Sequence, residues 1–239
     1  MELPRHGTRR EKEAGVVKAV LVAAGEADAR DVAQLADADL VIAVDGGARW
    51  LDGAGVLPDL LLGDLDSVEP ALVARLAEAG VEVERHPREK DESDAELAVG
   101  RAVAAGADRV VLIGALGGAR LDHELANLLL LADRRWHAGR RDLRIVRGGT
   151  QVRALHGGDR LELDGAPGSF VTLLPLAGDA EGVTSDGLRY GLDGERLPFG
   201  RPRGLSNRVE RIPASVSLER GTLLVIESEP GGTDELHGI

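Results

Sequence analysis

Hydrophobic and polar positions change their pattern near Gly148-Gly149, which divides the chain into two parts. In the first part, short apolar runs alternate with segments whose apolar residues recur every three or four positions. The apolar runs predict strands at 16–23, 40–44, 60–62, 81–84, 110–113 and 143–146. The periodic segments predict helices at 29–36, 70–79, 93–105 and 121–138. Alternation of this kind is typical of a parallel sheet covered by helices.

The second part loses the helical period and shows only short apolar runs with Gly and Pro between them. Strands are predicted at 152–155, 160–163, 170–174, 209–212, 216–218 and 223–226. Short strands at such spacing favour a β-sandwich. We therefore predict an α/β fold, with a parallel-sheet domain over residues 16–148 followed by a smaller all-β sandwich domain over residues 149–229.

Composition excludes several classes of function. The 239 residues include no cysteine, so disulfides and thiolate metal sites are ruled out, and the six histidines lack zinc-ligand spacing. A net charge of −12 argues against nucleic acid as a partner, because that binding depends on basic patches. The longest apolar run, 125–132, is too short to cross a membrane, and residues 1–14 resemble neither a signal nor a transit peptide. We expect a soluble, cytoplasmic protein.

The most informative local feature is the sequence GDLDS at residues 63–67, which follows the predicted strand at 60–62. Side chains repeat every two residues along an extended chain, so Asp64 and Asp66 are expected to point the same way. A divalent cation such as Mg²⁺ would offset the repulsion between the two carboxylates. The segment is equally consistent with a turn before a helix, in which Ser67 caps and Pro70 lies in the first turn.

Two further segments are expected at the same edge of the sheet, beyond the carboxyl ends of the strands. The glycines of Asp45-Gly46-Gly47 would let the backbone approach a ligand, or would simply form a turn. The sequence KDESDAE at 90–96 contains a capping box, Ser93 with Glu96. The same segment offers Asp94 as a metal ligand and Lys90 as a counter-charge for phosphate.

A glycine-rich loop at 114–119 runs into Arg120 and Asp122, which open a predicted helix. Its backbone N–H groups and Arg120 would suit phosphate oxygens. His123 alone is more typical of a structural histidine, and Asn127 shares its helix face. In the second part, SDGLRY at 185–190 and RGLSN at 203–207 are, by spacing alone, two hairpin turns.

Taken in order, these motifs resemble those of the thiamine pyrophosphokinase (thiamine diphosphokinase) family. The pattern is D-G-G-A, P-D-x-x-x-G-D-x-D-S, K-D-x-[ST]-D-x-E, a glycine-rich loop with R-x-D-H and a following Asn, then G-L-x-Y and G-x-S-N, and it spans about residues 40–226. Each motif is weak alone, but the ordered set is specific. The chain departs from the family at Ser93, where Thr is usual, and at residues 117–120, a loop one residue longer than the family's G-G-R.

The resemblance implies an ATP- and Mg²⁺-binding catalytic domain at 16–148 and a thiamine-binding sandwich at 149–229. It implies transfer of diphosphate from the co-substrate ATP to thiamine, with AMP as the second product. It also implies a homodimer whose active site is shared between subunits. The implied catalytic residues are Asp64, Asp66, Asp91, Asp94 and Asp122, among which Asp64, Asp66 and Asp94 would bind Mg²⁺, and either Asp91 or Asp122 would orient or deprotonate the thiamine hydroxyl.

The same resemblance assigns residues to the two substrates. Nucleotide binding would fall to Asp45, Gly46, Gly47, Ser67, Lys90, Gly117, Gly118, Arg120, His123 and Asn127. Thiamine binding would fall to Ser185, Tyr190, Ser206 and Asn207, with Tyr190 stacking on the cationic thiazolium and Ser206 and Asn207 bonding the aminopyrimidine. Two alternatives are a 6-hydroxymethylpterin pyrophosphokinase, which the Tyr190 and Ser206-Asn207 set argues against, and a non-catalytic nucleotide- or thiamine-binding module, which the five retained aspartates argue against.

Overall fold

A computed structural model describes residues 16–230 of the chain, which forms two compact units that divide between Gly148 and Gly149. Residues 1–14, on which the expectation about targeting peptides depends, lie outside the described residues. Among residues 16–230, no helix is long and apolar enough to cross a membrane.

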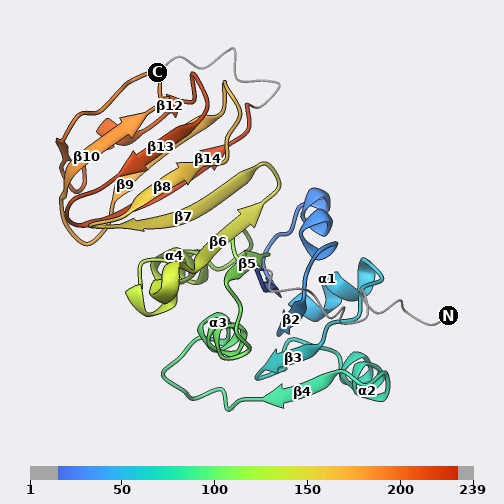
Figure 1. Ribbon diagram of the computed structural model, residues 1–239. Coiled ribbons are helices and arrows are strands. Elements are labelled where there is room, and N and C mark those ends of the chain that lie inside the picture. Colours follow the sequence, from blue (N-terminus) through green and yellow to red (C-terminus); the bar gives the residue numbers. More distant parts are fainter. Residues whose placement is uncertain (1–15, 231–239) are drawn as a thin grey trace. The chain divides into compact units, whose positions relative to one another are not determined.

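The first unit is built on a parallel sheet, as the alternating pattern predicts (Figure 1). Its strand order is β6-β5-β1-β2-β3-β4. The chain adds strands from β1 outward to β4 and then returns to the other side of β1 for β5 and β6. The strands are β1 (Lys18–Val22), β2 (Leu40–Val44), β3 (Leu60–Gly63), β4 (Glu82–Arg85), β5 (Arg109–Ile113) and β6 (Asp142–Arg147).

The helices of this unit are α1 (Gly47–Gly53), α2 (Pro70–Glu78), α3 (Asp94–Ala104) and α4 (Leu121–Leu130), with 3₁₀ helices η1 (Ala29–Leu35) and η2 (Arg134–Arg140). Two predictions need correction, and one helix was missed. The segment predicted at 29–36 is a 3₁₀ helix over Ala29–Leu35 that begins at the Asp28–Asp31 capping box, and 3₁₀ geometry is typical of such short helical pieces. The helix predicted at 121–138 stops at Leu130, and η2 follows after Asp133, which caps it. Helix α1 was not predicted, because its Gly46-Gly47 start indicates a turn.

Both faces of the parallel sheet carry apolar side chains, because successive strand residues alternate between the faces. Val20, Val41 and Leu61 belong to a core that also holds side chains of η1, α1 and α2. Helix α3 contacts β1, β2 and β3 and buries Ala98, Val99 and Ala102. Coverage of both faces explains why these strands are continuous apolar runs.

The second unit consists of two antiparallel sheets around one core, which confirms the predicted all-β sandwich (Figure 1). The strand orders are β12-β9-β14-β7 and β11-β10-β13-β8. Core residues such as Leu173, Val183, Val216 and Val225 come from both sheets. The strands are β7 (Thr150–His156), β8 (Arg160–Leu163), β9 (Phe170–Pro175), β10 (Ala180–Asp186), β11 (Glu195–Leu197), β12 (Asn207–Arg208), β13 (Ala214–Ser217) and β14 (Thr222–Ser228).

Two differences from the predicted strands have physical causes. The segment predicted at 209–212 is not a strand: Val209 pairs with Leu188 in an isolated bridge, and the regular pairing with β9 involves Asn207 and Arg208. Strands β10 and β11 were not predicted. Polar residues and Gly182 interrupt the apolar pattern of β10, and β11 is only three residues long. A shift in register between Ala180 and Val183 accompanies that interruption.

Candidate active site

The loops that follow β1 and β5 meet where the strand order reverses, the position at which open α/β sheets bind ligands. Their backbones are joined directly: Gly25 N–H donates to Gly114 O (2.7 Å) and Glu26 N–H donates to Leu116 O (3.1 Å). A Cβ on Gly25 would lie 2.5 Å from Gly114 O, so only glycine allows this approach. The glycine-rich loop is therefore held against the first loop of the sheet.

The Asp45-Gly46-Gly47 segment continues from β2 into α1 and requires its second glycine. A Cβ on Gly47 would lie 1.8 Å from Val22 O, at the end of the neighbouring strand β1. Asp45 adopts a left-handed backbone with φ of 46°, and Leu65, in the loop after β3, has φ of 62°. Leu65 N–H donates to Asp45 Oδ1 (3.0 Å), which links the two strained loops. Unusual backbone conformations in adjacent loops are typical of functional sites.

Asp45 is the carboxyl group of this region whose pKa is strongly raised. Its pKa is raised to about 6, first by burial and also by the negative charges of Asp94 and Asp64 and a hydrogen bond to Asp94, against the lowering effect of the Leu65 N–H. Three aspartates from the ends of β2 and β3 and the start of α3 thus lie within electrostatic reach of one another. Perturbed carboxyl groups of this kind are common in sites that bind cations or transfer protons.

The GDLDS loop differs in geometry from the prediction. Strand β3 ends at Gly63, so the two-residue alternation does not extend through Asp64 and Asp66. Instead, Asp64 Oδ1 accepts a hydrogen bond from Asp66 N–H (2.9 Å), and Asp66 is exposed. The alternative interpretation also needs correction, because α2 begins after Glu69 with Pro70 at its start, and Ser67 is not its cap.

Two arginines that the motifs did not single out lie at this loop. Arg88 Nη1 is 3.8 Å from Asp66 Oδ2. The guanidinium group of Arg49, in α1, donates a hydrogen bond to the backbone oxygen of Ser67. A Cβ on Gly46 would lie 3.1 Å from Arg49 Nη2 and 3.3 Å from Ser67 Oγ, so these groups surround the start of α1. Spacing could not reveal either arginine, because neither belongs to a recurrent motif.

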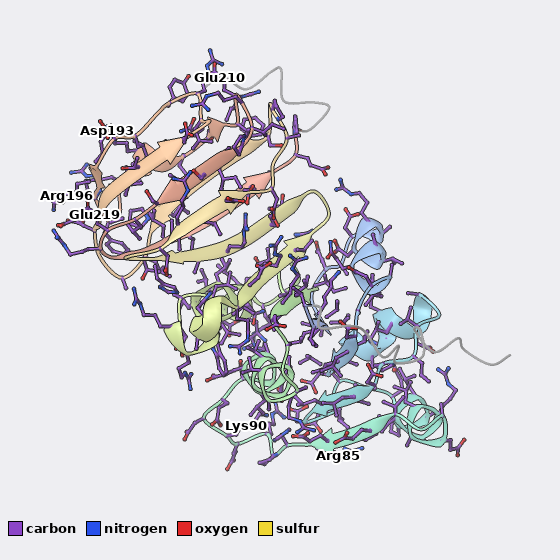
Figure 2. The ribbon with its side chains drawn as sticks, in the orientation of Figure 1. Arg85, Lys90, Asp193, Arg196, Glu210 and Glu219 are labelled. Atoms are coloured by element: carbon purple, nitrogen blue, oxygen red, sulfur yellow. The ribbon has the colours of Figure 1, made fainter. Side chains whose placement is uncertain are left out.

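The segment that starts at Lys90 lies between β4 and α3, and Figure 2 shows Lys90 in that loop. Ser93 caps α3 and accepts a hydrogen bond from Glu96 N–H (3.1 Å). The Glu96 side chain instead pairs with Arg135 (2.8 Å). Of the predicted capping box, the structure therefore shows the bond to Ser93 but not the return bond from the Glu96 side chain. Lys90 Nζ lies 3.0 Å from Asp94 Oδ1, and Asp91 is exposed. The lysine therefore neutralises part of the charge shared by Asp94 and Asp45.

The glycine-rich loop after β5 has left-handed glycines at Gly117 (φ 77°) and Gly118 (φ 104°). Asn127 Nδ2 donates to Ala115 O (2.8 Å), which fastens the loop to α4. Arg120 donates to both carboxylate oxygens of Asp122, at 2.9 and 2.6 Å. This pairing holds the pKa of Asp122 well below its usual range, so Asp122 remains a carboxylate. His123 is exposed at the start of α4.

The predicted acceptor residues lie in the second unit. Asn207 and Tyr190 are joined by two hydrogen bonds, Asn207 Nδ2 to Tyr190 O (2.7 Å) and Tyr190 N–H to Asn207 Oδ1 (3.0 Å). Ser206 precedes Asn207 and has a left-handed φ of 57°. Ser185 Oγ accepts a hydrogen bond from Leu192 N–H (3.0 Å), at the other end of the loop that carries Tyr190. The structure thus brings Tyr190, Ser206 and Asn207 together and gives Ser185 a role within the loop.

The carboxylates of this region are candidate ligands for a divalent cation. Within residues 16–230, no group of three or more His, Asp or Glu side chains is already arranged to hold a metal ion. The donor chemistry nevertheless suits a hard cation, because Asp94 Oδ1 is buried and accepts no hydrogen bond from any described residue, although Lys90 is near. The mutual repulsion of Asp45, Asp64 and Asp94 would also be relieved by a cation.

Sequence reasoning also missed Glu26 and Arg147, which form an ion pair over Gly117. The loop after the first strand lacks the G-x-G-x-x-G pattern that would have drawn attention to it. The position of this loop in the fold could have identified it as part of the site, because the loop after the central strand of such a sheet lies at the point where the strand order reverses. Asp45, assigned to the nucleotide by the family resemblance, is in addition a partner of Asp94.

Comparison with known proteins gives a consistent result. Residues 33–141 match the family model "Thiamin pyrophosphokinase, catalytic domain", and residues 160–223 match "Thiamin pyrophosphokinase, vitamin B1 binding domain". The chain is 26% identical over 199 residues to a thiamine pyrophosphokinase of Bacillus subtilis, covering 79% of this chain and 87% of that protein. It is 27% identical over 222 residues to thiamine pyrophosphokinase 1 of Oryza sativa, covering 79% of each.

Solved structures show the same similarity in three dimensions. The crystal structure of the Bacillus subtilis thiamine pyrophosphokinase superposes with a TM-score of 0.77 at 25% identity, over 90% of this chain and all of that one. Yeast thiamin pyrophosphokinase superposes with a TM-score of 0.74 over 92% of this chain and 89% of that one. At 13% identity, this second likeness concerns the fold alone.

Proposed function

Because this chain belongs to the thiamine pyrophosphokinase family, we propose that it transfers the diphosphate group of ATP to thiamine, giving thiamine diphosphate and AMP. One observation carries the proposal: the two family models match in the family's order, the catalytic one within the first unit and the vitamin B1 binding one within the second. The reaction consumes ATP, so we also propose a cytoplasmic location.

Transfer of a phosphoryl-type group depends mainly on positioning and on neutralisation of charge. We propose that Asp64 and Asp94 hold Mg²⁺ together with Asp66, and that Asp45 contributes through its contact with Asp94. When bound, Mg²⁺ would neutralise phosphate charge and polarise phosphate oxygens. Lys90, which now balances Asp94, would be available to the phosphates once a cation shares the carboxylates.

The nucleotide is proposed to lie along the loops that follow β1, β2 and β5. Gly46, Gly47, Gly117 and Gly118 lie in those loops or at the start of α1, and Gly118 leaves its backbone open. Arg120, His123 and Asn127 lie at the start of α4 or within it, and Ser67 lies in the loop after β3, where its backbone oxygen accepts a hydrogen bond from Arg49. Asn127 acts on this site indirectly, because its side chain donates to Ala115 O and so supports the glycine-rich loop. Arg120 provides positive charge at the start of α4.

The choice between Asp91 and Asp122 as the group that accepts the thiamine hydroxyl proton can be narrowed. Asp122 is ion-paired with Arg120, and its low pKa makes it a weak proton acceptor. We therefore propose that Asp122 orients Arg120 and that Asp91, which is exposed in the loop before α3, accepts the proton. Tyr190 and Ser206 would bind the acceptor rings from the second unit.

A direct assay tests the reaction. The protein is incubated with ATP, Mg²⁺ and thiamine, and both AMP and thiamine diphosphate are quantified over time. We expect the two products in equal amounts. Formation of ADP with thiamine monophosphate would contradict diphosphate transfer, and use of 6-hydroxymethylpterin in place of thiamine would identify the related pterin enzyme.

We further propose a homodimer in which each site takes its thiamine contacts from the neighbouring subunit, as the family resemblance implies. Helix α4 supports an interface, because Leu121, Leu125 and Leu129 repeat along one face and are 67%, 52% and 56% exposed. Asp66→Asn subunits are mixed with subunits that carry Tyr190→Ala. Mixed dimers should regain activity, because one of their two sites is intact; activity that stays at the parental level in proven mixed dimers would refute a shared site.

A further inference from the structure

The loop that carries Tyr190 is held against the segment that begins at Asn207. Arg189 N–H donates to Arg208 O (2.9 Å), and Leu188 forms an antiparallel bridge with Val209. The Leu188 and Val209 side chains are both buried in the core of the second unit. This pairing fixes the base of the loop. Tyr190 itself extends beyond the bridge, where its backbone N–H and its backbone oxygen both bond the Asn207 side chain.

Asn207 uses its side-chain amide almost completely on backbone groups. Nδ2 donates to Tyr190 O (2.7 Å), while Oδ1 accepts from Tyr190 N–H (3.0 Å) and from Arg208 N–H (2.8 Å). The oxygen of an amide accepts two hydrogen bonds, so Oδ1 has its full number. The residue is only 7% exposed. An amide in this state has little capacity left for a ligand.

Tyr190 shows the opposite combination of features. Its backbone N–H and its backbone oxygen are both held by the Asn207 side chain, yet the residue is 63% exposed. The guanidinium carbon of Arg189 lies 5.7 Å from the centre of the ring, so the ring already contacts a cation in the free protein. A rigid backbone with an exposed ring is what a stacking platform for a cationic ring requires, since less freedom is then lost on binding.

We propose that Asn207 is a positioning residue that fixes Tyr190 in its binding conformation, and that it does not itself bond the aminopyrimidine. The inference rests on the proposed function, because thiamine is the ligand that Tyr190 would hold. It replaces the role that the family motif suggested for Asn207. Its neighbour Ser206, whose N–H is held by Thr172 Oγ1 (3.1 Å), keeps an exposed side chain at the same place.

The first experiment needs no ligand. Tyr190 is the only tyrosine in the sequence, so labelling with ¹⁵N-tyrosine gives a single backbone amide signal in NMR. In the wild-type protein this amide should exchange with solvent at least about tenfold more slowly than an unstructured amide, despite the exposure of the residue. Exchange at the unstructured rate would overturn the proposal without any variant.

Variants then separate the two hydrogen bonds. Asn207→Ala removes the acceptor, so protection of the Tyr190 amide should be lost. Asn207→Asp keeps the acceptor and removes only the donor to Tyr190 O, so protection should persist. Gln151→Ala removes another side-chain amide of the same unit, which bonds Glu227 and Asp164, and should leave the signal unchanged. Equal protection in Asn207→Ala and the wild-type protein would contradict the assignment.

The second experiment measures thiamine affinity by calorimetry in a double-mutant cycle. Asn207→Ala should raise the dissociation constant by about tenfold, the scale expected when a binding group loses its fixed position. In a Tyr190→Ala background it should add nothing, because the group it positions is gone. Equal effects in both backgrounds would show that Asn207 contacts thiamine directly. Absence of thiamine binding to the wild-type protein would refute the proposed function, and the amide exchange result would still decide whether Asn207 holds Tyr190.

Discussion

The pKa of Asp45 leads to an uncommon prediction: removing this site carboxylate should stabilise the protein, and more so at alkaline pH. Asp45→Asn keeps an oxygen that can accept the hydrogen bond from Leu65 N–H. The new amide can donate to Asp94, which at present shares a hydrogen bond with Asp45. Asn also tolerates the left-handed conformation of this position, where φ is 46°. The substitution therefore changes charge with little change in shape.

The direction of the pH dependence follows from the pKa values of Asp45 in the unfolded and folded states. The pKa of Asp45 is raised from 3.8 to about 6 in the folded protein, so between these values the folded state binds a proton that the unfolded state lacks. The contribution of Asp45 to the free energy of unfolding is therefore largest below about pH 4 and is lost as the pH rises through about 6. A shift of about two pKa units corresponds to about 3 kcal/mol. Asp45 is only half-buried, and solvent screening reduces this to about 1–2 kcal/mol.

The assay is urea denaturation in metal-free buffer at about pH 5 and pH 8, comparing Asp45→Asn with the wild-type protein. The gain in the free energy of unfolding should be larger at the higher pH by about 1 kcal/mol. Asp52→Asn is the matched control, because Asp52 also lies in the first unit but is paired with Arg75 at 2.8 and 2.9 Å, which lowers its pKa. That variant should lose stability above the ordinary pKa of Asp, by at most about 1 kcal/mol.

The reasoning would be refuted if Asp45→Asn were less stable than the wild-type protein at about pH 8, or if its advantage did not depend on pH. Either result would mean that the three aspartates are better separated or better solvated than the geometry indicates. Addition of Mg²⁺ provides a second check. The cation should stabilise the wild-type protein at the higher pH, because it relieves the same repulsion.

Three further predictions concern other parts of the molecule. Asp66→Asn should reduce thiamine diphosphate formation by about 10²-fold and change the free energy of unfolding by less than about 0.5 kcal/mol, because Asp66 is exposed; near-normal turnover would return the GDLDS loop to a purely structural role. Gly47→Ala should destabilise the protein by about 2 kcal/mol or more in urea denaturation, since the new methyl group would meet Val22 O, and a neutral effect would show that α1 can shift. Glu227→Gln should lower stability by about 2 kcal/mol, because the buried Arg153 would keep only the more exposed Asp164, 3.6 Å away, as a counter-charge; an unchanged unfolding midpoint would contradict that dependence.

The parallel sheet could be predicted closely, because burial on both faces makes its strands continuous apolar runs. The bounds of β2 were predicted to the residue, and β3 and β5 each to within one. In the sandwich, β8 was equally clear, whereas β10 was missed. Strand β10 contains Gly182 and several polar residues, and its pairing is shifted in register, so its identity depends on neighbours that the local sequence does not specify.

The site was predicted in outline but not in its contacts. Short motifs reveal which residues lie in the loops after the strands, and those loops do adjoin one another in the first unit. The directions of side chains in these loops do not follow from strand periodicity, as the bond from Asp66 N–H to Asp64 shows. Contacts such as Arg49 with Ser67 join segments far apart in sequence and depend on the exact course of each loop.

The loop conformations that sequence periodicity could not predict are those that bring the carboxylates together. Left-handed residues at Asp45 and Leu65 are unfavourable in isolation, so the surrounding structure must hold them in place. One support is the bond from Leu65 N–H to Asp45, and another is the absence of a side chain at Gly63, where a Cβ would lie 1.9 Å from Asp45 Oδ1. The fold thus maintains backbone strain and like-charge repulsion at the same place. Both are unfavourable for stability alone, and both are in keeping with the cation-binding role that we propose for these carboxylates.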